Sequence, residues 1–484
     1  MAAPLQVSVV GTRRGWKKAA GIIAPLVAGA VVWLTPVPAG LTTNAWRYFG
    51  LFAAVMVGVI AEPIPPAAIG LLGVTVAALT GLVRASTSDA AAWALSGFSN
   101  TTVWLIFAAY MFALGYSKTG LGRRTALVMI RAMGKRTLGL GYAIAAADLV
   151  LAPFMPSNTA RSAGTIFPVI RNIPELFGSR INDGTARKMG AYLMYTALAV
   201  TCVTSSMFVT AMAPNVLALT LISKVIQATI SWTAWLKGFA PTGLILLAMV
   251  PVLVYKIYPP EIKESPDAPR WAATELRSMG RITRQEMTLL ALVIVALSLW
   301  IGGAKYVDAT VAAMLVVAVV ILRVVSWNDV LGNAGAWNVF VWFATLVTLA
   351  SGLAEVKFVN WVAQSLSPLL SGRGILMAIL LVVGAFFLLH YLFASVTAHV
   401  SALLQVFLAV AISVPGVSPV TWALLLAYSL GLMGILTPYG TGPSPIYYGC
   451  GYIKGKDFWI LGATMGLIFF LVYGLIEVPW LLKM

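Results

Sequence analysis

The sequence predicts an all-α polytopic membrane protein on three observations: an apolar composition, apolar runs long enough to cross a bilayer, and an uneven distribution of Lys and Arg. Of the 484 residues, 60% are hydrophobic and only 10% are charged, whereas soluble domains carry about 25% charged residues. The longest hydrophilic stretch, from about 259 to 286, is too short for a separate soluble domain, which needs roughly 50 residues. We therefore expect one membrane domain over residues 1–484.

The net charge of +17 fits membrane topology better than a nucleic-acid partner. A nucleic-acid site needs a basic patch with interleaved aromatic residues or a recognisable motif, and the sequence offers neither. Cytoplasmic loops of membrane proteins are enriched in Lys and Arg. Cys202 and Cys450 both lie in apolar surroundings, so they indicate neither a disulfide nor a metal site. We expect no nucleic acid, cofactor or metal.

Eleven apolar runs approach the ~20 residues that cross a bilayer. They fall at about 19–35, 45–62, 66–83, 101–117, 189–225 (interrupted), 238–256, 287–303, 306–323, 338–354, 419–449 (interrupted) and 458–480. Two further apolar stretches, 137–170 and 374–413, are each interrupted by a polar tripeptide: Ser157-Asn158-Thr159 in the first and Ser395-Val396-Thr397 in the second. Each half is too short to span. We therefore expect eleven transmembrane helices and two re-entrant hairpins with polar tips.

The distribution of basic residues favours this topology. With a cytoplasmic N-terminus and hairpins that return to their own side, 23 Lys and Arg lie on the cytoplasmic side and 8 outside, which leaves Arg161 in the first tip. The cytoplasmic clusters are Arg13 to Lys18, Lys118 to Arg136, Arg171 to Lys188 and Lys256 to Arg284. If both hairpins crossed fully, the third cluster would move outside, which the positive-inside rule disfavours.

The chain also repeats itself. Val103-Trp104 recurs as Val341-Trp342, and Ser157-x-Thr159-Ala160 recurs as Ser395-x-Thr397-Ala398, both at an offset of 238 residues. Five crossings separate the two copies, and an odd number makes the second copy enter from the opposite face. The sequence therefore predicts inverted repeats, the architecture of many secondary transporters. The expected divisions are N-terminal helices (1–100), repeat 1 (101–257), a cytoplasmic loop (258–286) and repeat 2 (287–484).

The two polar tips predict an anion site. A helix break at membrane depth is tolerated only where it is buried in protein or lines an aqueous cavity. Ser and Thr just before a helical run are good N-caps, and a helix that starts there directs free N–H groups and a partial positive charge at the tip. Two such tips that meet near the midplane would suit an anion. The alternative for each tip is a helix cap without a binding role.

A basic residue stands two places after the Thr of each tip, Arg161 in the first and His399 in the second. A charged residue at membrane depth costs ~2.5 kcal/mol or more and is a functional hypothesis by default. We expect the pair to supply positive charge near a bound carboxylate. The alternatives are that Arg161 snorkels to the interface and that His399 is a hydrogen-bonded core histidine. His390 has no counterpart in the other repeat, which indicates a structural role.

Two interrupted helices are matched between the repeats as well, at 211–215 and 436–445. Pro and Gly break helices and free carbonyl groups, and transporters bind cations or complete a substrate pocket on such backbone. A Pro kink without function is the alternative. Asp148, the notable acidic residue at depth, is either a proton or cation site or the partner of Arg161. The residues expected to support the site from these breaks are Pro214, Asn215, Thr437, Pro438, Thr441, Gly442 and Pro443.

Enzyme motifs find little support. Gly134-Lys135-Arg136 lacks the upstream glycine and the following Ser or Thr of a P-loop. The sequence has no His-Glu-x-x-His pair for zinc and no Gly-x-Ser-x-Gly elbow. We therefore expect no enzyme, and an intramembrane enzyme is a weak alternative.

Longer strings resemble a known family. The tips Ser157-Asn158-Thr159-Ala160 and Ser395-Val396-Thr397-Ala398, with the breaks Ala213-Pro214-Asn215 and Leu436-Thr437-Pro438, look like those of the divalent anion/sodium symporter family. The strings "APFMPSNTARSAGTIFPVIRN", "SSMFVTAMAPNVL", "HYLFASVTAH" and "LTPYGTGPSPIYYGCGY" are closer still to its exchanger branch. That branch includes plastid 2-oxoglutarate/malate translocators and bacterial citrate/succinate and tartrate/succinate antiporters. The likeness runs from about Trp46 to the C-terminus.

The resemblance implies a homodimer with eleven helices per protomer, two opposed hairpins and an elevator motion of the transport part against a scaffold to which most of 1–100 belongs. It also implies a dicarboxylate bound between the tips, on Ser157, Asn158, Thr159, Ser395 and Thr397. Sodium-coupled members carry Ser-Asn-Thr at both tips, commonly followed by Ala-Thr. Here Val396 replaces the second Asn, and Arg161 and His399 stand in place of a small residue. A guanidinium would repel sodium and do its work of neutralising a carboxylate.

The expected function is therefore sodium-independent exchange of dicarboxylates such as 2-oxoglutarate, malate and succinate, with citrate or tartrate as further substrates. A sodium- or proton-coupled symporter of the same fold is the nearest alternative, and uptake into vesicles empty of counter-anion would support it. An anion channel, from a different class, would conduct without counter-substrate. The absence of a long Ser- and Arg-rich leader favours the inner (plasma) membrane of a bacterium over a plastid.

Overall fold

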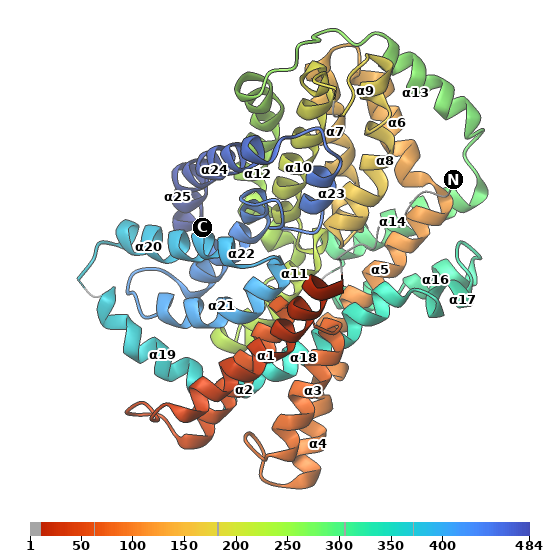
Figure 1. Cartoon of the computed structure of the whole chain (residues 1–484). Coiled ribbons are helices and arrows are strands. Elements are labelled where there is room, and N and C mark those ends of the chain that lie inside the picture. The colour runs from red at the N-terminus through yellow and green to blue at the C-terminus, as the bar shows by residue number, and fades with distance from the viewer. Residues whose placement is uncertain (1–10, 62, 182, 304–305, 371) are drawn as a thin grey trace, which may run out of the picture. The chain divides into compact units, whose positions relative to one another are not determined.

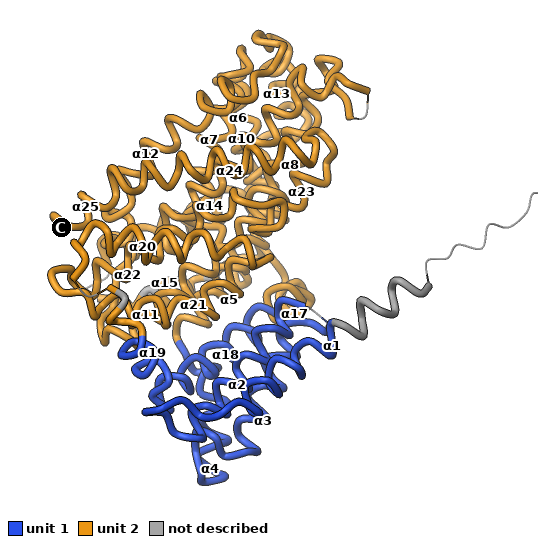
Figure 2. Tube along the Cα trace, turned by 60° about the vertical axis from the view of Figure 1, so that its left-hand side comes forward, with its two compact units in different colours: residues 1–100, 338–365 blue, residues 101–337, 366–484 orange. Residues whose placement is uncertain are grey.

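The computed structural model describes residues 11–61, 63–181, 183–303, 306–370 and 372–484, and the regular elements in these ranges are helices (Figure 1). The chain divides into two compact units (Figure 2). Unit 1 comprises residues up to 100 and 338–365, and unit 2 comprises 101–337 and 366–484. The all-helical architecture confirms the fold class predicted from the sequence.

Unit 1 is organised around α18. Its helices are α1 (Gly11–Leu34), α2 (Thr43–Ala61), α3 (Pro66–Leu79), α4 (Thr87–Leu95), the 3-10 helix η1 (Ser96–Ser99), α18 (Ala334–Glu355) and α19 (Phe358–Leu366). The Tyr48 hydroxyl of α2 donates to the Leu349 carbonyl of α18 over 2.7 Å. A Cβ at Gly97 would lie 1.8 Å from the Ala344 carbonyl oxygen, so only glycine lets η1 lie against α18.

The first half of unit 2 runs from α5 to α17. Its helices are α5 (Thr101–Thr119), α6 (Leu121–Met133), α7 (Thr137–Leu151), η2 (Ala152–Phe154), the π-helix η3 (Thr159–Ile166), α8 (Phe167–Ile170), α9 (Ile173–Leu176), η4 (Ala186–Lys188), α10 (Gly190–Met207), η5 (Val209–Ala211), α11 (Ala213–Ile226), α12 (Trp232–Ile257), α13 (Asp267–Ser278), α14 (Arg284–Gly302), α15 (Ala309–Ala313), α16 (Val316–Ile321) and α17 (Trp327–Leu331).

The second half of unit 2 repeats the order of the first. Its helices are η6 (Ser367–Leu369), α20 (Ile375–Leu388), η7 (Leu389–Leu392), α21 (Val396–Ala411), α22 (Pro419–Leu432), η8 (Met433–Ile435), α23 (Ser444–Gly449), α24 (Gly455–Val472), the π-helix η9 (Tyr473–Glu477) and α25 (Val478–Lys483). In each half a helical hairpin (α7 with η3, then α20 with α21) precedes a broken helix (α10 with α11, then α22 with α23). A long helix then follows, α12 or α24.

The core of unit 2 is formed by the first parts of the two broken helices. Every residue of α10 is buried, and α22 is buried from Trp422 to Leu432. The Ser206 hydroxyl of α10 donates to the Tyr428 carbonyl of α22 over 2.7 Å. A Cβ at Gly431 would lie 2.7 Å from the Ser206 amide nitrogen. Small residues therefore bring the two backbones into contact, as in other membrane helix pairs.

Both interrupted stretches fold back on themselves, as predicted. The amide of Thr137, where the first stretch begins, donates to the Lys263 carbonyl, and the amide of Ile262 donates to the Lys188 carbonyl beyond its end. One segment of the 258–286 loop therefore holds both the start of 137–170 and the chain that follows this stretch. The two ends of the second stretch also lie close together, because a Cβ at Gly416 would lie 2.9 Å from Cδ1 of Ile375.

The expectation that each half is too short to span is wrong for the first arms. Thr137–Phe154 and Ile375–Leu392 are 18 residues each and apolar enough to cross. Their turn is therefore set by the polar tips, not by a lack of length. In the described residues, eight helices satisfy the length and composition of a span, and six shorter apolar helices accompany them. The predicted run 306–323 is divided between the short helices α15 and α16, and eleven crossings stay a prediction.

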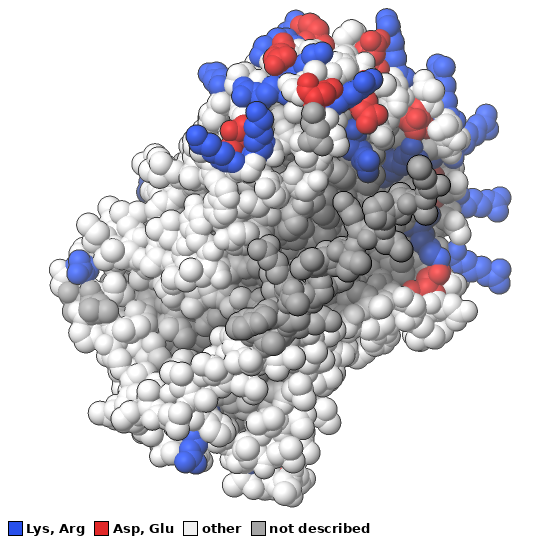
Figure 3. Space-filling model, in the orientation of Figure 1, with Lys and Arg blue, Asp and Glu red and all other residues white. Residues whose placement is uncertain are grey.

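Charged side chains of unit 2 gather over α6, α9 and α13 (Figure 3). Three predicted cytoplasmic clusters meet there: Arg136 lies 3.3 Å from Glu264, and the amide of Glu261 donates to the Arg187 carbonyl. We refer to this region as the charged end of unit 2. The side chains of the cluster Arg13 to Lys18 lie outside the described residues, and the cytoplasmic placement of the charged end stays a prediction.

Candidate functional site

The first tip, residues 157–159, lies between η2 and η3 and contacts the broken helix of the second repeat. Asn158 Nδ2 donates to Thr441 Oγ1 over 2.8 Å. A Cβ at Gly442 would lie 1.8 Å from Thr159 Oγ1, so the backbone at Gly442 touches the tip directly. Ser157 Oγ accepts a hydrogen bond from the Ala160 amide over 3.2 Å, which is the capping role expected of it. The tip residues are half-buried.

The chain returns from this tip as the π-helix η3, Thr159–Ile166. Such i→i+5 segments are rare and occur frequently at functional sites. Arg161 and Ser162 of this π-helix are buried, whereas Asn158 and Thr159 at the tip are half-buried. The sequence predicted a helix at this position but not its π geometry.

Arg161 is completely buried, and its guanidinium donates hydrogen bonds to protein groups. Nε donates to Asp148 Oδ1 of α7 over 2.9 Å, in an ion pair enclosed on both sides. Nη1 donates to the Met155 carbonyl just before the tip (3.0 Å) and to the Ala211 carbonyl in the break between α10 and α11 (2.6 Å). Nη2 lies 3.2 to 3.3 Å from the hydroxyls of Thr201, Thr204 and Ser205.

This network decides between the alternatives for Asp148 and Arg161. Asp148 is the partner of Arg161, and Arg161 does not snorkel to the interface. The positive charge is therefore matched by a carboxylate rather than held bare for a bound anion. Arg161 joins three parts of the chain: the outgoing arm of the hairpin, the tip, and the broken backbone of the next helix.

The second tip lacks such a network. Ser395 occupies the N-cap position of α21 but makes no side-chain cap bond, so the capping expected there is absent. The Thr397 carbonyl accepts from the Ser401 hydroxyl over 2.7 Å. Ser395 and Thr397 are half-buried, and in the part of the chain that the structure describes no hydrogen bond links their side chains to the first tip.

His399 is buried among aromatic rings, and neither ring nitrogen has a hydrogen-bond partner. The ring centroids of Phe386, Phe393 and His390 lie 4.4, 5.1 and 5.2 Å from its own. His399 is therefore not the hydrogen-bonded core histidine considered from the sequence. Its role as a basic residue near a substrate stays a prediction.

The break between α10 and α11 is held by Asn215. Its Nδ2 donates to the carbonyls of Ser205 (2.6 Å) and Phe208 (3.0 Å), which the end of α10 leaves without helical partners. Pro214 stands in the first turn of α11, where proline fits a helix start. Asn215 Oδ1 is buried without a partner, so this amide still has one acceptor to offer.

The second break, 436–445, lies between η8 and α23 and contributes polar groups at several points. Thr441 is buried and bonded to Asn158, whereas Thr437 is buried with a free hydroxyl. The Pro443 carbonyl accepts from the amides of Ile446 and Tyr447, which starts α23. Pro438 is half-buried, and nothing in the structure assigns it more than the break.

Two contacts near the site and one buried acidic residue elsewhere in unit 2 were not anticipated. The hydroxyls of Ser162 and Tyr447 lie 2.9 Å apart, which ties the returning arm to α23. His390 Nε2 lies 2.7 Å from the Gly440 carbonyl, so His390 fixes the second break. Glu477 in η9 is buried with both oxygens unpaired, and its position within the predicted run 458–480 was a signal that pointed to it.

The described geometry defines a class: a membrane transporter in which two helical hairpins each precede a broken helix and the first hairpin tip meets the broken helix of the other repeat. The chain matches the family model of the sodium:sulfate symporter transmembrane region over residues 16–483. It is 44% identical over 472 residues to the L-tartrate/succinate antiporters of Escherichia coli (strain K12) and Shigella sonnei (strain Ss046), covering 95% of this chain and 97% of each relative. The chain therefore belongs to the sodium:sulfate symporter family, the divalent anion/sodium symporters that the sequence motifs indicated.

A solved structure supports the fold. The chain is similar to the YdaH transporter of Alcanivorax borkumensis, with a TM-score of 0.57 over 97% of both chains and 14% sequence identity. At this identity the likeness concerns the arrangement of helices only.

Proposed function

We propose that this protein is an antiporter that exchanges one dicarboxylate for another, with L-tartrate and succinate as the first pair to test. The relatives that are 44% identical over nearly the whole chain are L-tartrate/succinate antiporters. The tip residues Asn158 and Thr159 present polar groups at a broken helix, which suits carboxylate oxygens. 2-Oxoglutarate, malate and citrate are further candidates for the same site.

The observation that carries the sodium-independent form of this proposal is the position of Arg161 Nη1. It donates to the carbonyls of Met155 and Ala211, one at the hairpin tip and one in the broken helix. Carbonyls freed by unwound backbone are the groups with which transporters coordinate sodium. Arg161 therefore replaces a cation by satisfying these carbonyls, while Asp148 balances its charge. In this role it braces the tip without touching the substrate.

Obligatory exchange follows from the positive charge that the site keeps when no substrate is bound. The first turns of η3 and α21 begin at the two tips and direct partial positive charge toward the site. A bound dicarboxylate compensates this charge. An empty carrier has nothing to compensate it and no sodium to release, so it crosses slowly. The proposal also includes a homodimer in the bacterial inner membrane, with a cytoplasmic N-terminus. Each protomer moves its substrate by an elevator motion.

The experiment is uptake of labelled succinate into proteoliposomes that are loaded with unlabelled succinate or L-tartrate, or left empty. We expect rapid uptake into both loaded sets and little into empty vesicles. Equal uptake into empty and loaded vesicles would contradict exchange and favour a symporter or a channel. Loading with 2-oxoglutarate, malate or citrate in parallel measures the substrate range.

A further inference from the structure

A cavity of about 540 Å³ opens at the charged end of unit 2, between the returning arm of the first hairpin and α23. This volume lies in the range of small-molecule sites, about 300–1,000 Å³. Its lining comes from the arm, the loop after it and the helix after the second break, and includes Phe167, Arg171, Glu175, Arg180 and Pro445. We call this space the arginine cavity.

The inner wall of the arginine cavity adjoins the candidate site. Pro445 lies three residues after Gly442, whose backbone contacts the first tip. The ring of Phe167 meets the ring of Tyr447 edge to face at 5.4 Å between centroids, and the Tyr447 hydroxyl contacts Ser162 of η3. Tyr447 therefore contacts both the lining residue Phe167 and a residue that follows the tip.

The two arginines are available to an anion. Arg171 and Arg180 are exposed, and neither forms an ion pair with an acidic residue of the described chain. Arg171 rests on the Phe167 ring, with 5.8 Å from Cζ to the centroid, which orients the guanidinium without using its hydrogen bonds.

Two acidic residues are near the arginines. Glu175 lines the cavity. The Asp183 carboxylate accepts from the hydroxyl and amide of Thr185, and these bonds, with a smaller effect from Arg180, hold its pKa below the usual value. Asp183 is therefore already engaged, and the lining of the cavity keeps more positive than negative charge.

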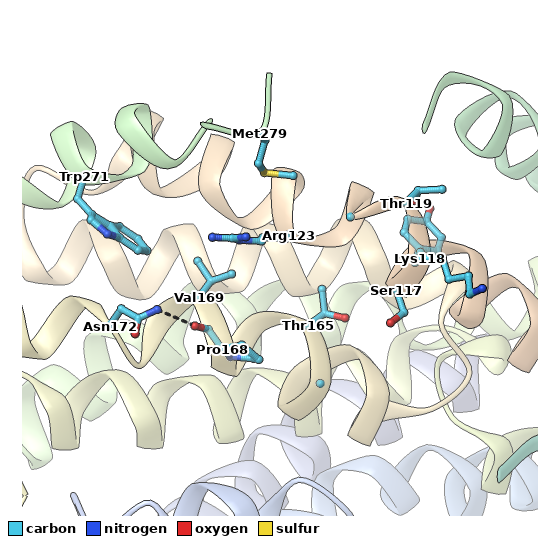
Figure 4. Close-up of a pocket in the computed structure, with 13 residues that line it drawn as sticks. Ser117, Lys118, Thr119, Arg123, Thr165, Pro168, Val169, Asn172, Trp271 and Met279 are labelled. Carbon is cyan, nitrogen blue, oxygen red and sulfur yellow. Dashed lines mark hydrogen bonds between the residues drawn. The ribbon is translucent and has the colours of Figure 1, made fainter. Parts of the chain in front are cut away.

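A neighbouring cavity shows the contrast. It has about 430 Å³, lies between the α5–α6 corner, η3, α8 and α13, and is also lined by two cations, Lys118 and Arg123 (Figure 4). Arg123 extends into it between Trp271 and Thr165 (Figure 4). Here both cations are paired, Lys118 with Asp329 and Arg123 with Glu275. An anion that enters this second cavity has to displace a carboxylate, whereas one that enters the arginine cavity does not.

We propose that the arginine cavity is the entrance through which dicarboxylates reach the first tip from the charged end, with Arg171 and Arg180 as the residues that attract them. A cleft lined by one sign of charge raises the local concentration of counter-ions and their rate of association, and salt weakens the effect. The inference rests on the proposed exchange function and adds the side of entry and the residues that serve it. Arg171 and Arg180 bind no substrate at the tip, so they set the rate of arrival and not the rate of translocation.

The test compares the KM for succinate on each face of the membrane, in right-side-out and inside-out vesicles that contain an internal counter-anion. The variants are Arg171→Gln, Arg180→Gln and their combination. Arg131→Gln is the matched control, because it removes one exposed cation of α6 at the same end without lining this cavity. We expect the double variant to raise the KM roughly 3- to 10-fold on one face only, with unchanged maximal rate and with a weaker dependence of KM on ionic strength.

A KM that the double variant leaves unchanged or raises equally on both faces, or a control that behaves like the double variant, would overturn the inference. Loss of the effect in vesicles without anionic lipid would do so as well, since it would assign the arginines to a lipid phosphate. The proposed function fails in a different way: the wild-type protein would then show no dependence on an internal counter-anion. Retention of maximal rate and of KM on the opposite face shows that the variants are folded.

Discussion

The first hairpin tip is held by hydrogen bonds and the second by aromatic packing, although both follow the same order of helices. Six hydrogen bonds from Arg161 join Asp148, the tip and the broken helix behind it. At the matching place in the other repeat, His399 touches rings and bonds to nothing. The repeat thus conserves the arrangement of helices and not the way in which a tip is fixed.

This difference teaches that the two tips need not move alike. A buried and fully bonded guanidinium allows one geometry, because each displaced bond leaves a buried polar group without a partner. Aromatic contacts tolerate small sliding because they have no single hydrogen-bond geometry to keep. We therefore expect the first tip to move with its repeat as a rigid piece and the second to adapt to the substrate.

Among variants that test the difference between the two tips, Arg161→Ala has the largest expected effect on stability and exchange. Removal of one partner from a buried ion pair costs about 3–5 kcal/mol, since Asp148 is left charged and enclosed. We expect a marked fall of the melting temperature in detergent and loss of succinate exchange. The double variant Asp148→Ala with Arg161→Ala removes the orphaned charge and regains part of the stability. A single variant as stable as the wild type would show that the network does not hold the tip.

Gly442→Ala tests the contact of the first tip with the second repeat. The new Cβ would lie 1.8 Å from Thr159 Oγ1, so the Thr159 side chain or the backbone of the break has to move. A displacement of this order reduces the rate of a positioned process by about 100-fold, and we expect a loss of exchange approaching that size. Gly474→Ala is the control in the same unit, because nothing lies within 4 Å of its Cβ position. Equal exchange rates for the two variants would contradict the contact.

His399→Phe gives a smaller expected effect. The imidazole makes ring contacts only, so an aromatic ring of similar shape changes stability by less than about 1.5 kcal/mol. We expect exchange within a fewfold of the wild-type rate. A loss of exchange comparable with that of Arg161→Ala would instead assign His399 the basic role near the substrate that its position in the repeat suggested.

Lys118→Ala gives the smallest expected effect. The hydrogen bond from Lys118, followed by those from Ser326, lowers the pKa of Asp329 from 3.8 to about 2. The folded-state pKa is below the unfolded one, so the stabilisation is complete above pH 3.8 and is lost as the pH falls through about 2. Both side chains are partly exposed, which keeps the effect small. The gap in melting temperature between wild type and variant should therefore narrow on acidification, and a constant gap would contradict this account.

Much of the fold followed from local patterns in the sequence. Apolar runs interrupted by Ser157-Asn158-Thr159 and Ser395-Val396-Thr397 predicted two hairpins, because polar groups at membrane depth need a protein or aqueous environment. Pro214 and Pro438 predicted the broken helices, because proline interrupts a helix and frees carbonyl groups. Each of these signals is carried by residues adjacent in the chain, and each was confirmed.

The site followed less completely, because its contacts join residues far apart in the chain. Arg161 bonds to the Ala211 carbonyl 50 residues away, and Asn158 bonds to Thr441 at a separation of 283 residues. No local pattern states which carbonyl a guanidinium reaches or whether a histidine will be surrounded by rings. The sequence therefore identified Arg161 and His399 by symmetry, but their different surroundings became visible only in the folded chain.

The central claim is that Arg161 takes the place of a cation, and sodium dependence tests it most directly. The measurement is the initial rate of labelled succinate uptake into succinate-loaded proteoliposomes, with sodium present on both sides or replaced throughout by choline. The account predicts the same rate in both conditions and at every sodium concentration between them. A rate that rises with sodium and falls to background in choline would contradict it.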